Sequence, residues 1–166
     1  MSLPAAVRKL MLTAHIVASV GWLGAVVVFV ALSCIALASD DEQTVRGVYL
    51  VMEPAAWFVL LPLAVASLVT GLMQSLGTEW GLFRHYWVVF KLGINVASTF
   101  FLLMYMATFE AMADAAGDST ADLEAVRSLS PLLHGAAALV LLSTASVLAV
   151  YKPRGRTPLA RRKPAH

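Results

Sequence analysis

The fold is decided by residues 10–39, which read LMLTAHIVASVGWLGAVVVFVALSCIALAS. This stretch contains no Asp, Glu, Lys or Arg, and its only titratable side chains are His15 and Cys34. A helix needs roughly 20 predominantly apolar residues to cross the hydrocarbon core of a bilayer. The stretch is long and apolar enough to do so, and it predicts a membrane-spanning helix rather than a soluble core helix.

The composition extends this prediction to the whole chain. Of its 166 residues 60% are hydrophobic and only 13% are charged, whereas about 25% are charged in a soluble domain. Because a segment in lipid must satisfy its own backbone hydrogen bonds, each apolar stretch is expected to be a helix. We expect an all-α integral membrane four-helix bundle in one domain. Its spans are about 10–38, 48–75, 86–109 and 132–151, and residues 152–166 form a basic, disordered tail.

The distribution of basic residues predicts the orientation. Arg8 and Lys9 precede the first span, Arg84 lies between the second and third, and six further Lys or Arg residues follow the fourth. The other two connections are mainly acidic, so the helices should run up-down-up-down with both termini cytoplasmic, in the inner membrane of a bacterium. Topology thus accounts for the net charge of +2, and no nucleic-acid partner is expected. A signal peptide cleaved after Ala38 is the alternative, but the apolar run is longer than such signals require.

The connections contain helix-start signals. Ser39 with Glu42 three residues later has the pattern of a capping box, which predicts that the second helix begins outside the membrane. Ser119 begins a similar pattern, and we expect a short amphipathic helix that ends near Pro131. Pro62, inside the second span, should kink that helix and free a backbone carbonyl.

His15 is the first candidate site residue. Together with Ser19 and Trp22 it occupies positions i, i+4 and i+7, so the three side chains share one helix face that should point into the bundle. In one interpretation this face is a packing seam, where His15 bonds a backbone carbonyl or a hydroxyl. In the other, neutral His15 ligates a metal, with haem iron favoured, because ionisable groups inside a membrane are functional candidates by default.

A polar stripe on the third span is the second candidate. Lys91, Asn95 and Ser98 lie at i, i+4 and i+7 and must face protein, water or a cofactor. Lys91 either snorkels to the cytoplasmic interface or is the counter-charge of an anionic group such as a haem propionate. Asn95 is deeper and needs a partner across the bundle, and its role stays open.

The remaining histidines lie at span ends. His85 and Arg84 sit at the inner mouth of the third span, where His85 is either a solvated interfacial residue or a second axial ligand and Arg84 would neutralise a propionate. His134 opens the fourth span on the outer side, near Glu53, and a contact between them is conceivable. By depth, His134 is too far from His15 to share one iron.

Other site classes are poorly supported by the sequence. It contains no His-Glu-x-x-His motif and no phosphate-binding glycine loop. The single cysteine, Cys34, excludes an intramolecular disulfide and a cysteine-based zinc site.

Two segments carry a resemblance to known families: residues 15–24 (HIVASVGWLG) and 86–93 (YWVVFKLG). The first resembles the first helix of the copper resistance protein D family. Both resemble the HemJ-type protoporphyrinogen oxidase family, which implies a haem b site with His15 as an axial ligand and Lys91 near it. The whole chain resembles uncharacterised four-helix membrane proteins of high-GC bacteria, which implies the fold and no activity. The copper family would imply periplasmic copper handling, but no Met/His cluster lies on the outer side.

The leading functional hypothesis is a small membrane protein that binds haem b for electron transfer or haem-linked redox chemistry. His15, His85, Lys91, Arg84 and Trp22 are its candidate site residues, with His15 on the iron. The alternative is a non-enzymatic scaffold or small transport component without a cofactor, whose polar groups join helices at about 1 kcal/mol each. Expected partners are the lipid bilayer and other membrane subunits or a second copy. Whether the protein is an enzyme stays open.

Overall fold

The computed structural model describes residues 4–77, 82–122 and 127–158. Within them the regular structure is helical, apart from one isolated bridge between His85 and Arg156. The helical segments in chain order are α1 (Ala5–Ala38), α2 (Glu42–Ala55), the π-helix η1 (Ala56–Leu60), α3 (Leu61–Gly77), α4 (Tyr86–Gly117) and α6 (Ser130–Tyr151).

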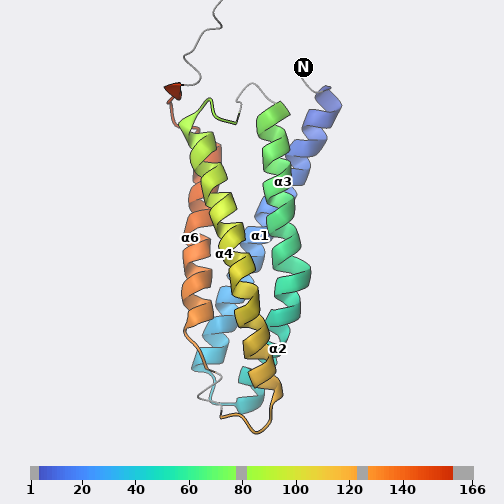
Figure 1. Cartoon of the computed structure of the whole chain (residues 1–166), viewed down its shortest axis with the longest axis vertical. Helices are drawn as coiled ribbons and strands as arrows, with labels where there is room; N and C mark the ends of the chain where they lie inside the picture. Colours follow the sequence, from blue (N-terminus) through green and yellow to red (C-terminus); the bar gives the residue numbers. More distant parts are fainter. Residues whose placement is uncertain (1–3, 78–81, 123–126, 159–166) are drawn as a thin grey trace, which may run out of the picture.

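The helices form one elongated bundle (Figure 1). Since α2, η1 and α3 follow one another without a break, the described chain has four helical stretches long and apolar enough to cross a membrane. Each predicted span lies within one of them. The prediction of an all-helical chain with four such helices is confirmed. The start of α1, the end of α3 and the start of α4 lie at one end of the bundle, here called the N-terminal end, and the opposite end is called the α2 end.

The surface and the interior have the polarity expected in lipid. Large apolar side chains face outward along the bundle, among them Phe58, which is 81% exposed, and Val150, which is 75% exposed. A water-soluble monomer rarely exposes such continuous apolar surface. The core combines aliphatic residues and methionines with aromatic rings, and Phe29 packs edge-on against Phe109 at 5.5 Å between ring centroids. Fully buried alanines such as Ala56 let the helices approach closely.

The second helical stretch is interrupted by the π turn η1. The amide of Leu61 donates to the carbonyl of Ala56, five residues earlier, and Pro62 follows at once. Proline has no amide hydrogen to donate and its ring displaces the preceding turn. A widened turn therefore lies just before Pro62, the residue at which the sequence predicts a kink and a freed carbonyl.

The N-cap of α2 differs from the sequence prediction. Asp41 is the cap, and its Oδ2 accepts hydrogen bonds from the amide of Thr44 at 3.0 Å and the hydroxyl of Thr44 at 2.6 Å. These bonds hold the pKa of Asp41 below its usual value. The predicted capping box at Ser39 is wrong, because Ser39 instead closes α1 by donating its amide to Ile35. An ionised carboxylate is a stronger acceptor for helix amides than a hydroxyl.

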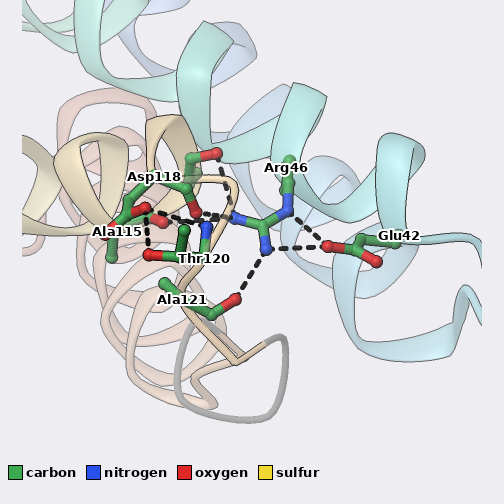
Figure 2. Close-up of polar contacts among 7 residues, drawn as sticks. Glu42, Arg46, Ala115, Asp118, Thr120 and Ala121 are labelled. Carbon is green, nitrogen blue, oxygen red and sulfur yellow. Dashed lines mark hydrogen bonds and ion pairs between the residues drawn. The ribbon is translucent and has the colours of Figure 1, made fainter.

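At the α2 end, Arg46 clamps α2 to the end of α4 (Figure 2). Its Nε donates to Glu42 Oε1 at 2.8 Å, and its two Nη atoms donate to four backbone carbonyls. The accepting carbonyls belong to Ala115, Ala116, Asp118 and Ala121. The last carbonyls of a helix have no partner within the helix, and the guanidinium fork can satisfy several at once. The clamp therefore fixes the connection that follows α4.

At the N-terminal end, the chain after α6 is bonded to the connection before α4. The amide of Thr157 donates to Arg84 at 3.0 Å and the amide of Tyr86 donates to Gly155 at 3.4 Å. The first residues of the expected tail thus lie along the start of α4. The rest of that tail, residues 159–166, and part of the amphipathic helix expected before Pro131, residues 123–126, fall outside the described residues.

Candidate functional site

The His15 ring is held in one orientation by α3. His15 is only 5% exposed, and its Nδ1 lies 3.1 Å from the carbonyl oxygen of Ser67. Because a carbonyl can only accept, Nδ1 carries the hydrogen and Nε2 keeps its lone pair. The hydroxyl of Thr70 also lies 3.1 Å from Nδ1 and directs its own hydrogen to the Ala66 carbonyl. The tautomer of His15 is therefore fixed by the backbone of α3.

Lys91 on α4 reaches the other ring nitrogen. Its Nζ lies 3.0 Å from Nε2 of His15, so the ammonium donates to the lone pair that the tautomer leaves free. Two candidate residues 76 positions apart in the chain thus meet inside the bundle. Neither of the two interpretations of Lys91 at the sequence level included this direct contact.

A second polar layer lies beside this pair. The hydroxyl of Ser67 lies 2.8 Å from that of Ser19 and 3.4 Å from Oδ1 of Asn95. The amide group of Asn95 points back to the Lys91 carbonyl at 3.5 Å. Asn95 therefore has the partner across the bundle that its depth requires, and the polar groups of α1, α3 and α4 form one connected cluster.

Gly71 on α3 makes room for the His15 ring. A Cβ atom at this position would lie 3.0 Å from Cε1 of His15 and 3.5 Å from Nδ1. Contacts that short require one of the two groups to move. The absence of a side chain at Gly71 is thus what lets α3 approach the ring of α1 closely.

A cavity of about 490 Å³ opens beside His15 and Lys91 at the N-terminal end. Its floor includes Ser67 and Asn95, and apolar residues of all four helical stretches form much of its wall. Four cationic residues line it: Arg8, Lys9, Lys91 and Lys152. None of the described residues that line it is acidic. The cavity therefore suits a ligand with an apolar body and anionic groups.

Three candidate residues lie elsewhere. The backbone of His85 accepts hydrogen bonds from the first turn of α4, and neither His85 nor Arg84 lines the cavity. Trp22 is 2% exposed in the core and lines a different cavity. Among the described residues no group of three His, Cys, Asp or Glu side chains could hold a metal ion. Of the five candidates, the structure brings together His15 and Lys91.

The contribution of α3 to the cavity was not predicted from the sequence. Ser67, Gly71 and Gln74 all line the cavity, and they lie at i, i+4 and i+7 in an otherwise apolar span. That polar and small-residue stripe was the available signal. Arg8 and Lys9 had been interpreted only as topology signals, although they also line the cavity.

A second cavity, of about 310 Å³, lies toward the α2 end and is lined by α1, η1, α4 and α6. His134 lines it, with Nδ1 2.8 Å from the Ser130 carbonyl and its ring 4.4 Å from that of Tyr105. The contact between His134 and Glu53 is not formed among the described residues.

Comparison of the chain with protein-family models, with curated proteins and with solved structures finds no match.

Proposed function

We propose that this chain is a bacterial inner-membrane protein that binds haem b through His15. In this proposal the helices run up-down-up-down across the bilayer with both termini cytoplasmic, so the His15 cavity lies near the cytoplasmic face. The basic residues at the N-terminal end, including Arg8 and Lys9, support this orientation. The observation that supports a bound cofactor is the position of the His15 ring. Ser67 fixes its orientation, and Nε2 lies at a cavity that is lined by cationic residues.

The hydrogen bond from Nδ1 to Ser67 supports iron binding. Metal-ligating histidines almost always donate their other ring hydrogen to a carbonyl, carboxylate or water, which fixes the ring and raises the basicity of the ligating nitrogen. His15 has this arrangement. The cavity of about 490 Å³ beside the ring is compatible with a bound cofactor.

Each residue of the site would then have its own role in haem binding. His15 would bind the iron through Nε2, and Ser67 would hold its tautomer. Nε2 cannot accept from Lys91 and bind iron together, so Lys91 would leave it and join Arg8 and Lys9 in binding the carboxylates. Haem, when bound, supplies one-electron redox chemistry. His85 and Arg84 lie outside the cavity lining and have no role in this arrangement.

The second candidate function is a scaffold or small transport component without a cofactor. The observation that favours it is that His15, Lys91, Ser67 and Asn95 already satisfy one another by hydrogen bonds across three helices. Such bonds join membrane helices with about 1 kcal/mol each.

An absorption spectrum separates the two functions. The protein is expressed with ample haem precursor, purified in detergent, and measured oxidised and reduced. We expect a Soret band that shifts on reduction, is lost in His15→Ala, and is retained in His85→Ala, the matched control outside the cavity. A colourless wild-type protein, or a band that survives in His15→Ala, contradicts the haem proposal and favours the scaffold.

A further inference from the structure

The second cavity contains an unsatisfied hydrogen-bonding group. Ser98 on α4 lines it and is only 7% exposed. Its hydroxyl has no hydrogen-bond partner among the described residues. A buried hydroxyl without a partner is uncommon and costs free energy. A ligand in this cavity could supply the missing partner.

A second polar group at the cavity is His134, an exposed residue near the start of α6, toward the α2 end. Nδ1 of His134 is turned to the Ser130 carbonyl at 2.8 Å and therefore carries the hydrogen. Nε2, on the opposite side of the ring, is left as an acceptor. Tyr105 donates its hydroxyl hydrogen to Ser130 Oγ at 2.8 Å and stacks against the His134 ring. His134 thus offers a lone pair in a fixed orientation.

The spacing of these groups limits the size of the ligand. Ser98 and Tyr105 are seven residues apart on α4, a rise of about 10.5 Å. Since the His134 ring lies against that of Tyr105, a ligand that bonds both Ser98 and His134 must extend along about two turns of α4. A flat ring with a polar oxygen at each end has this form.

The walls indicate how such a ligand enters. Between the polar groups the cavity is lined by apolar and aromatic residues, including Trp22 and Phe29. Phe101, also in the lining, is 62% exposed at the bundle surface. In the proposed membrane orientation this part of the lining borders lipid, so a lipid-soluble ligand would enter the cavity past Phe101.

From these features we propose that the second cavity binds the head group of a membrane quinol. One ring hydroxyl donates to Nε2 of His134, and the opposite hydroxyl pairs with Ser98. An oxidised quinone has only carbonyl acceptors and cannot donate to Nε2, so the site prefers the reduced form. This inference does not depend on haem at His15.

Calorimetric titration of the detergent-solubilised full chain with decylubiquinol, kept reduced, tests this site. Ser98→Ala is expected to weaken binding about five- to tenfold, the effect of one hydrogen bond, without lowering Tm, because the hydroxyl has no partner to lose. Thr99→Val is the matched control, since its hydroxyl is also buried without a partner but Thr99 does not line the cavity.

Two further titrations complete the test. Decylubiquinone should bind more weakly than decylubiquinol to the wild type, and His134→Phe should abolish that preference. The proposal is overturned if Ser98→Ala binds like the wild type, if Thr99→Val loses as much affinity, or if decylbenzene binds as well as decylubiquinol. Quinol binding should persist in His15→Ala, which separates this inference from the haem proposal.

Discussion

Replacement of Gly71 by alanine is the smallest change that tests the geometry around His15. The added Cβ would lie 3.0 Å from Cε1 of His15 and 3.5 Å from Nδ1. The ring must then move by a few tenths of an ångström, or α1 and α3 must separate. Either movement lengthens the 3.1 Å bond between Nδ1 and the Ser67 carbonyl toward the limit of a useful hydrogen bond.

The expected magnitude follows from two destabilising effects and one stabilising effect. Extra atoms forced into a packed interior cost typically about 1–3 kcal/mol, and loss of the bond to Ser67 adds about 1 kcal/mol. Alanine in place of glycine in a helix recovers up to about 1 kcal/mol. We therefore expect Gly71→Ala to lower the free energy of unfolding by about 1–3 kcal/mol and to weaken haem binding.

Gly93→Ala is the matched control, because nothing lies within 4 Å of a Cβ at Gly93 on α4. Thermal unfolding in detergent should show a lower Tm for Gly71→Ala than for the wild type, and an equal or higher Tm for Gly93→Ala. Haem titration of the same proteins should show weaker binding for Gly71→Ala alone. If the two variants have the same Tm and the same haem affinity, the close approach of α3 to His15 is refuted.

Three further predictions concern the clamp, the connection after α4, and Lys91. Arg46→Gln should lower the free energy of unfolding by about 2 kcal/mol and Arg46→Lys by nearly as much, since an ammonium cannot bridge four carbonyls; denaturation curves like the wild type's would contradict this. The hydroxyl and amide of Thr120, and Arg46, hold the pKa of Asp118 below its usual value. The stabilisation is therefore present above about pH 4 and lost as pH falls through the lowered pKa. Hydrogen exchange at the Thr120 amide, corrected for intrinsic rates, should lose protection only as the pH falls below about 4. Protection that does not change with pH would refute the role of Asp118. Lys91→Met should keep the Soret band but lower the stability of the haem-free protein by about 1 kcal/mol, so unchanged unfolding of that form would count against the contact with His15.

The sequence predicts the architecture well because lipid imposes strong rules. The apolar run of residues 10–39 and the three that follow are helical, as a segment that crosses lipid must be to satisfy its own backbone. The periodicity of the first span also places His15 and Trp22 on an inward face, and both are buried. Ends of helices were less predictable: Asp41, not Ser39, is the N-cap of α2, since both residues carry suitable acceptors and only the local backbone selects between them.

The candidate site was only half predictable. His15 and Lys91 are visible because polar residues in apolar spans stand out, but their contact depends on how α1 and α4 are rotated about their axes. Sequence periodicity gives a helix face without giving its partner. Ser67 contributes through its backbone carbonyl, and a backbone acceptor has no sequence signature. Haem ligation and the orientation in the membrane stay predictions.

Rescue of a truncated ligand tests the central claim most directly, that Nε2 of His15 binds haem iron. His15→Gly removes the ring and leaves a space at α3 into which free imidazole can diffuse. We predict that purified His15→Gly lacks the wild-type Soret band and regains it on addition of haem and imidazole, while His85→Gly has the band without imidazole. A wild-type protein that takes up no haem, or a His15→Gly variant that binds haem equally with and without imidazole, would contradict it.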